Sequence, residues 1–222
     1  AGGMPNLRDL PHGDIGEMTA KLIETEGIKA LQYGDGHGWN PLRENIAMIM
    51  AKEGIQADPY RIQVTTGSQQ ALQLVAEVLI DPGDVILAES PSYVGALGVF
   101  HARRANVRHI EMDEDGLIPD ALREAIRSVR ADGGAIKFLY TIPNYHNPAG
   151  VSLSEERRPE IVDICRSEGV LIVEDNPYGL LGFEKEPSTA LQPLWPDGVV
   201  YLGSFSKIFA PGYRIGWALA PQ

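Results

Sequence analysis

Residues 199–219 read VVYLGSFSKIFAPGYRIGWAL. The apolar runs at the two ends of this stretch predict two strands, and the Ser/Gly-rich turn between them carries one lysine, Lys207. Ser204 and Ser206 precede this lysine, and Arg214 follows it. A lysine amine can form a Schiff base with an aldehyde, while hydroxyls and a guanidinium bind a phosphate dianion. The stretch therefore predicts a site for a phosphate-bearing aldehyde. The plainer alternative is a Lys and an Arg on a surface loop.

The chain around this stretch alternates between apolar strands and amphipathic helices. The continuous apolar character of the strands predicts an α/β fold with a mostly parallel sheet that helices cover on both faces. A good N-cap serine, Ser154, predicts the start of the helix after residue 153. We expect the other helices at residues 17–26, 41–52, 69–79, 93–102 and 119–130, and strands at residues 61–65, 85–88, 107–110, 135–141, 170–173 and 199–202.

Composition narrows the classes of function. The 222 residues are 44% hydrophobic, which is enough for one large domain with a core, and no run of 18 apolar residues predicts a membrane span. A net charge of −11 argues against a general surface for nucleic acid or an anionic membrane. Cys165 is the one cysteine, so no internal disulfide is possible, and we expect a cytoplasmic protein. The five histidines have no metal-ligand spacing, so no metal site is predicted.

Polar residues recur directly after the predicted strands. In a mostly parallel sheet, ligands bind beyond the carboxyl ends of the strands. Gly67, Ser68 and Gln69 open a helix there, and the free N–H groups and dipole of a helix start favour an anion. An ordinary N-cap serine is the alternative at Ser68. The other residues at strand ends are Tyr93, Asn147, Asp175 and Lys207.

These motifs together resemble those of the fold type I pyridoxal-phosphate (PLP) enzymes. The lysine turn, Asn147-Pro148-Ala149-Gly150 and the run from Asp175 to Tyr178 are similar to motifs of the class I/II aminotransferases, in the aspartate aminotransferase superfamily. The spacing of 28 residues between Asn147 and Asp175 also agrees with that family. Within this family, the sequence most resembles the branch that handles 2-aminoadipate and aromatic amino acids. The implied cofactor is PLP, and the implied substrates are an amino acid and a 2-oxo acid.

The resemblance implies a role for each catalytic residue. Lys207 carries the Schiff base and later moves the α-proton. Asp175 pairs with the pyridine nitrogen, because the family places this partner three residues before a tyrosine, which favours Asp175 over Glu174. Tyr178 and Asn147 contact the phenolic oxygen of the cofactor. The alternatives are that Asp175 only begins a turn before a proline and that Tyr178 is a core aromatic.

The remaining cofactor contacts follow from the same resemblance. Tyr93 stacks on the pyridine ring, unless it is simply a core tyrosine. Tyr33 reaches the phosphate bound by the other subunit, which implies a homodimer with shared active sites; the alternative is a loop aromatic. The phosphate is held by residues that begin a helix or lie in the lysine turn, namely Gly67, Ser68, Gln69, Ser204, Ser206 and Arg214.

The resemblance also implies a domain organisation. We expect an N-terminal arm at residues 1–14, whose first five residues resemble a substrate-contacting segment, and a PLP-binding large domain at residues 15–222. Family members continue into a small C-terminal domain that carries the arginine for the substrate carboxylate. We expect this small domain to be absent here and the large domain to be incomplete at its C-terminal end.

The function implied is a PLP-dependent aminotransferase that works by a ping-pong cycle. One alternative is a PLP-dependent lyase of the same fold, whose cofactor motifs would be the same. Another is the PLP-binding effector domain of an aminotransferase-like transcription regulator, which would need a DNA-binding domain elsewhere. A nicotinamide-binding Rossmann domain is disfavoured, because no G-x-G-x-x-G turn follows the first predicted strand.

Overall fold

The computed structural model describes residues 4–183 and 187–221, so the first three residues of the expected N-terminal motif lie outside the described part. Its centre is an eight-stranded sheet with the order β1-β8-β7-β6-β5-β2-β3-β4. The strands are β1 (Ile62–Thr66), β2 (Val85–Ser90), β3 (Asn106–Asp113), β4 (Gly116–Leu117), β5 (Ile136–Thr141), β6 (Leu171–Asp175), β7 (Val199–Ser204) and β8 (Ile215–Leu219).

The sheet is mostly parallel, as predicted. Strands β3, β2, β5, β6 and β7 pair in parallel in that spatial order. Strand β8 is antiparallel to both β7 and β1, and the two-residue β4 is antiparallel to β3. The chain enters β8 through the turn after β7 without a long crossover, so β8 can pair with β7 only in the antiparallel sense.

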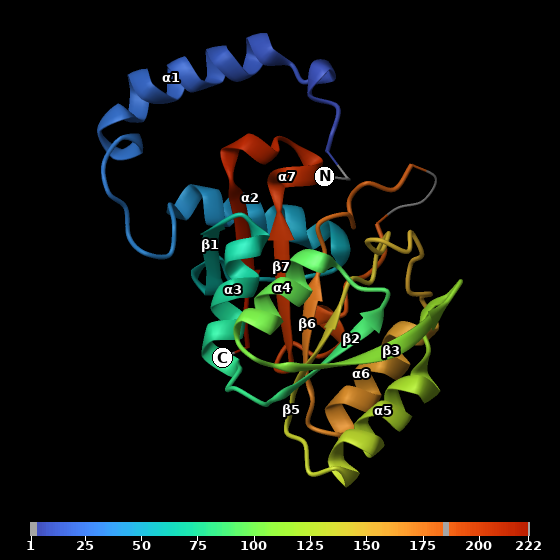
Figure 1. Cartoon of the computed structure of the whole chain (residues 1–222). Helices are drawn as coiled ribbons and strands as arrows, with labels where there is room; N and C mark the ends of the chain where they lie inside the picture. Colours follow the sequence, from blue (N-terminus) through green and yellow to red (C-terminus); the bar gives the residue numbers. More distant parts are fainter. Residues whose placement is uncertain (1–3, 184–186, 222) are drawn as a thin grey trace.

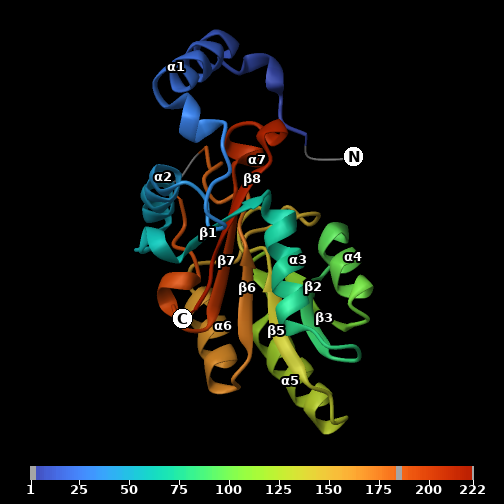
Figure 2. The ribbon, with the colours of Figure 1, turned by 90° about the vertical axis from the view of Figure 1, so that its left-hand side faces the viewer.

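Helices cover both faces of the sheet (Figures 1 and 2). Helices α3 and α4 pack on the face that carries Phe138, Tyr140 and Val173, while α5 and α6 pack on the opposite face, which carries Leu139 and Ile172. Neighbouring residues of one strand thus enter different cores, because side chains alternate along a strand. Helix α2 extends the second layer over β1, β7 and β8. The helices are α1 (His12–Ala30), α2 (Asn40–Met50), α3 (Ser68–Leu79), α4 (Val94–Ala102), α5 (Pro119–Ala131), α6 (Arg157–Ser167) and α7 (Phe205–Ile208).

The predicted N-cap at Ser154 is wrong. Helix α6 begins at Arg157, and Glu156 occupies the N-cap position without a side-chain hydrogen bond. The main-chain carbonyl of Ser154 accepts hydrogen bonds from the N–H groups of Arg157 (3.2 Å) and Arg158 (3.3 Å). A turn at residues 155 and 156 therefore comes before the helix, and Ser154 supports it through its backbone rather than its hydroxyl.

The N-terminal segment differs from the rest of the fold. Helix α1 buries none of its residues and stands away from the sheet (Figures 1 and 2). Several of its apolar side chains are exposed, including Met18 and Ile28, of which Ile28 is 92% exposed. Within residues 4–183 and 187–221, no helix combines the length and the apolar character needed to cross a membrane.

Candidate cofactor-binding site

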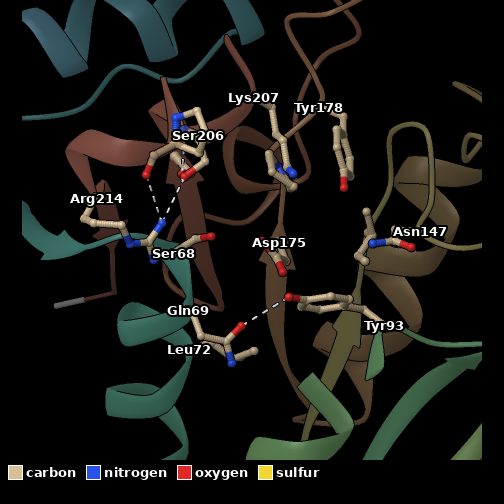
Figure 3. Close-up of a pocket in the computed structure, with 14 residues that line it drawn as sticks. Ser68, Gln69, Leu72, Tyr93, Asn147, Asp175, Tyr178, Ser206, Lys207 and Arg214 are labelled. Carbon is tan, nitrogen blue, oxygen red and sulfur yellow. Dashed lines mark hydrogen bonds between the residues drawn. The ribbon is translucent and has the colours of Figure 1, made fainter. Parts of the chain in front are cut away.

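A pocket of about 230 Å³ lies at the carboxyl ends of the parallel strands (Figure 3). Its walls come from the start of α3, the segments after β2 and β5, the end of β6 and the turn after β7. Parallel strands that end at one edge of a sheet bring together residues that are distant in the sequence. Ten of the twelve predicted site residues line the pocket: Ser68, Gln69, Tyr93, Asn147, Asp175, Tyr178, Ser204, Ser206, Lys207 and Arg214.

The other two predicted residues, Gly67 and Tyr33, do not line it. Gly67 lies behind the pocket wall with a left-handed φ of +77°, and a Cβ at this position would come within 2.5 Å of the Arg214 guanidinium. The backbone conformation therefore favours glycine here, and a Cβ would also displace the Arg214 guanidinium from its present position. Tyr33 is 98% exposed, so this chain alone does not bring it to the pocket.

Lys207 enters the pocket from α7, the short helix that directly follows β7. The Ser204 hydroxyl accepts a hydrogen bond from the N–H of Ser206 (3.0 Å) and so caps this helix. The Lys207 Nζ atom lies 5.9 Å from the ring centre of Tyr178, and the two side chains lie next to each other (Figure 3). The lysine is half-buried and lines the pocket.

Hydrogen-bond donors gather at one end of the pocket. Arg214 Nη1 donates to Ser206 Oγ (3.5 Å) and to the Pro211 carbonyl (3.4 Å) (Figure 3). Its Nη2 donates to the Thr66 carbonyl (3.4 Å). Beside them α3 begins at Ser68, and its N-cap makes no side-chain hydrogen bond. Strand β8 lies tightly against this helix start, since a Cβ on Gly216 would be 2.3 Å from the Ser68 nitrogen. The site thus combines a guanidinium, hydroxyls and the N-terminus of a twelve-residue helix. These groups together can bind an anion such as phosphate.

Asp175 forms the floor of the pocket. It is only 5% exposed, and burial raises the pKa of its carboxyl to about 6, while a hydrogen bond from Tyr140 opposes this rise. Asp175 Oδ2 accepts this bond from the Tyr140 hydroxyl at 2.7 Å. Asp175 Oδ1 has no hydrogen-bond partner among the residues that the structure describes. A buried carboxylate with one unused oxygen is suited to a cationic N–H donor in the pocket.

The neighbouring carboxylate, Glu174, lies on the other face of the sheet. Its two oxygens accept hydrogen bonds from the backbone N–H groups of Leu191 (2.9 Å) and Gln192 (3.0 Å). Burial raises the pKa of Glu174 to about 7, and the same backbone bonds oppose this rise. Glu174 does not line the pocket, so of these two acidic residues Asp175 alone has a carboxylate that faces it.

The sides of the pocket are formed by Asn147, Tyr178 and Tyr93. Burial raises the pKa of Tyr178, and a hydrogen bond with Asn147 partly opposes this effect. The Tyr93 hydroxyl donates to Gln69 Oε1 at 3.4 Å (Figure 3). Two aromatic rings and an amide therefore surround the space between Lys207 and Asp175.

Sequence reasoning missed residues that support the site from behind. Tyr140 carried no signal, because it sits within a continuous apolar strand. The buried His146 lies 3.1 Å from Glu89 Oε2, and Glu89 also accepts hydrogen bonds from Thr141 Oγ1 and the Ile142 N–H. This cluster connects the ends of β2 and β5 to the turn that carries Asn147. The acidic Glu89 at the end of an apolar strand was the sequence feature that could have indicated the cluster. Across the described ranges, no group of three or more His, Cys, Asp and Glu side chains could hold a metal ion.

Comparison with known proteins agrees with this geometry. The profile of the family "Aminotransferase class I and II" matches residues 8–222. The chain is 41% identical over 222 residues to aromatic-amino-acid aminotransferase 1 of Thermococcus litoralis, covering 99% of this chain and 53% of that protein. It is 37% identical to an uncharacterized HTH-type transcriptional regulator, YisV, of Bacillus subtilis, covering 96% of this chain and 43% of that protein.

Among solved structures, the Pyrococcus horikoshii kynurenine aminotransferase, crystallised with PMP, superposes with a TM-score of 0.92 at 38% identity. The match covers 98% of this chain and 54% of that chain. The chain thus spans about half the length of these relatives, and the matched half has the fold of the type I aminotransferases. The profile match and the identities over nearly the whole chain place this protein in the aminotransferase class I and II family.

Proposed function

We propose that the pocket binds PLP and that the protein containing this chain is an aminotransferase. The observation that carries the proposal is the unpartnered, buried Asp175 Oδ1 in the same pocket as Lys207. A buried acceptor without a partner is costly, so this oxygen calls for a donor from a ligand. The protonated pyridine nitrogen of PLP is such a donor, and Lys207 provides the amine that its aldehyde needs.

The other pocket residues fit the remaining parts of PLP. The Arg214 guanidinium, the hydroxyls of Ser68 and Ser206, and the uncapped start of α3 suit its phosphate. Asn147 and Tyr178 line the same pocket, and the side-chain amide and the hydroxyl can both donate to the phenolic oxygen of PLP. Tyr93 offers a ring face for stacking.

Bound PLP supplies an aldehyde that takes up amino groups and a cationic ring that draws electrons from the substrate Cα atom. The Lys207 amine would hold the aldehyde covalently in the resting enzyme, with release of one water when the bond forms. When it is not joined to the cofactor, the Lys207 amine would act as the base that accepts the proton from the substrate Cα atom and as the acid that returns it on the cofactor side. Asp175 keeps the positive charge on the ring nitrogen. Over a full ping-pong cycle, the amino group of one amino acid would be exchanged for the oxygen of a second 2-oxo acid, with one water consumed in the first half-reaction and one released in the second.

A single-turnover experiment on the full-length, PLP-loaded protein tests this function. Each amino acid of a panel is mixed with the protein in excess, and the cofactor spectrum and the released products are followed. We expect conversion of the cofactor to its amine form with release of the matching 2-oxo acid. Elimination products with a persisting aldehyde form would instead identify a PLP-dependent lyase, and failure to bind PLP would overturn the proposal.

A transcription regulator that binds PLP is a second candidate, because the similarity to the HTH-type regulator YisV covers nearly all of this chain. Such an effector domain would bind PLP through Lys207 but would not turn over amino acids. Exchange of amino acids on the cofactor without net conversion, together with DNA binding by the full-length protein, would favour the regulator.

We further infer a homodimer with shared active sites, in the cytoplasm. Tyr33 is 98% exposed, and α1 presents Met18, Ile28 and other apolar side chains without burying any of them. An exposed apolar helix of this kind suits a protein interface. We expect Ile28→Glu to shift the full-length protein from dimer to monomer in analytical ultracentrifugation, whereas Lys52→Glu, on the exposed 3-10 turn that follows α2, leaves the dimer intact. An unchanged dimer in Ile28→Glu would argue that α1 lies outside the interface.

A further inference from the structure

Tyr140 and Asp175 form a buried pair beneath the pocket. Tyr140 lies near the end of β5, and Asp175 ends the neighbouring parallel strand β6. Tyr140 is 0% exposed, and its hydroxyl donates to Asp175 Oδ2 at 2.7 Å. The Tyr140 ring packs edge-to-face on Phe100, with 5.4 Å between the ring centres, so its position is set by the α4 side of the core.

Because of this hydrogen bond, the two oxygens of Asp175 differ in their partners. Oδ2 is satisfied by the protein, while Oδ1 has no hydrogen-bond partner in the described part of the chain. A carboxylate held at one oxygen by a fixed donor can no longer rotate freely. Tyr140 therefore directs the unused acceptor capacity of Asp175 toward the ligand.

We propose that Tyr140 is a positioning residue: its hydroxyl orients Asp175 and stabilises the carboxylate charge, so that the proton shared with the ligand's ring nitrogen stays on the ring. This inference rests on the proposed binding of PLP. A ring nitrogen that keeps its proton withdraws electrons from the substrate more strongly than a neutral one. Removing the hydroxyl makes Asp175 more basic, and the proton then moves from the nitrogen to the carboxylate.

The electrostatics of the pair have the sign that this role requires. Burial raises the pKa of Asp175 to about 6, and the Tyr140 hydrogen bond acts against the rise. Burial, followed by the charge of Asp175, raises the pKa of Tyr140 well above its ordinary value, so the phenol keeps its proton and remains a donor. The other titratable groups that face the pair are Tyr93, Tyr178 and Lys207 around the pocket and Glu89 at the end of β2.

The chain contains a matched control on the opposite face of the sheet. Tyr201 is 1% exposed, and its hydroxyl donates to Glu53 Oε2 at 2.7 Å. Tyr140→Phe and Tyr201→Phe each remove one buried tyrosine–carboxylate hydrogen bond, so both carry a similar cost in stability. Only Tyr140 contacts a carboxylate of the pocket.

The test compares both variants with the parent in the full-length protein, first without cofactor. The carboxyl of Asp175 is titrated by ¹³C NMR of the labelled aspartates. In Tyr140→Phe, we expect the Asp175 carboxyl to bind its proton about tenfold more tightly than in the parent, which means a higher pKa of Asp175. In Tyr201→Phe, the pKa of Asp175 should stay unchanged. An unchanged titration in Tyr140→Phe would overturn the inference.

The second part uses PLP labelled with ¹⁵N in the ring. We expect the ¹⁵N shift of the parent and of Tyr201→Phe to report a protonated nitrogen, and that of Tyr140→Phe to move toward the neutral value. The amino-acid half-reaction of Tyr140→Phe should slow by about 10- to 100-fold. Identical ring signals in all three proteins would overturn the inference while the proposed function stands. Failure of the parent to bind PLP would instead overturn the proposed function, and the role of Tyr140 with it.

Discussion

The two faces of the sheet at the end of β6 hold buried carboxylates that differ in one respect. On the α6 face, both oxygens of Glu174 are bonded to backbone N–H groups, and Glu53 accepts hydrogen bonds from Asn176 and Tyr201. On the α3 face, one oxygen of Asp175 is left without a partner among the described residues. Burial raises the pKa of all three, so neither charge nor burial separates them. The unused capacity for hydrogen bonding does separate them, and it lies on the face where we propose that PLP binds.

The largest effect on the reaction rate should come from replacing Lys207, which lines the pocket on the α3 face. We expect Lys207→Ala to lower the rate of the amino-acid half-reaction by about 10⁴-fold or more, because both the covalent link and the proton transfer are lost. Stopped-flow spectroscopy of the PLP-loaded protein measures this rate. Lys52→Ala, which removes an exposed lysine of the other layer, is the control. Normal turnover in Lys207→Ala would remove the central premise of the site.

Removing the charge of Asp175 and of Glu174 in turn tests the difference between the two faces. We expect Asp175→Asn to slow removal of the α-proton by about 10²- to 10³-fold, since the ring nitrogen loses its charged partner. Glu174→Gln should leave this rate nearly unchanged per folded molecule. Deuterium exchange at the substrate Cα measures proton removal in both variants. If Glu174→Gln is the slow variant, the two faces have been assigned to the wrong roles.

A variant of Arg214 tests which end of the pocket binds the phosphate. We expect Arg214→Ala to weaken PLP binding by about 10- to 100-fold, as one charge-assisted contact is lost. Pyridoxal without the phosphate should bind the variant and the parent equally well. Arg127→Ala, at an exposed ion pair on α5, should change neither affinity. An equal loss for pyridoxal would mean that Arg214 supports the fold rather than the phosphate.

The smallest effect concerns Glu174 on the α6 face, and it changes only the free energy of unfolding. Burial raises the folded-state pKa of Glu174 from 4.5 to about 7. A raised pKa means that the folded state binds the proton more tightly, so this stabilisation is complete below pH 4.5 and is lost as the pH rises toward 7. Relative to Glu174→Gln, the parent should lose roughly 1–3 kcal/mol of unfolding free energy across that range. Urea denaturation at several pH values measures it, and a pH-independent difference would show that Glu174 does not titrate there.

Much of the architecture could be predicted because local pattern and tertiary structure agree. The continuous apolar run before Glu174 predicted a buried strand, and β6 is that strand. The start of α6 was the exception, because a serine suited to an N-cap sits where the backbone first makes a turn. The ten pocket residues were recognised from family-like motifs and from their positions after strands. Tyr140 and His146 were missed as supports of the site, since their partners lie more than 30 residues away on neighbouring elements.

The sequence by itself determined the class of fold, the residues at the strand ends and the chemistry that they offer. Alternation along β6 could have placed either Glu174 or Asp175 in the pocket, because a shift of one residue exchanges the faces. The family resemblance favoured Asp175, and the tertiary structure gives the physical reason, since pairing with β5 and β7 and packing against α3 set which side chains face the pocket. It also decided that one carboxylate is saturated by backbone N–H groups from a distant loop while its neighbour keeps an open oxygen. Hydrogen-bond saturation depends on contacts between distant segments, and a local pattern does not encode those contacts.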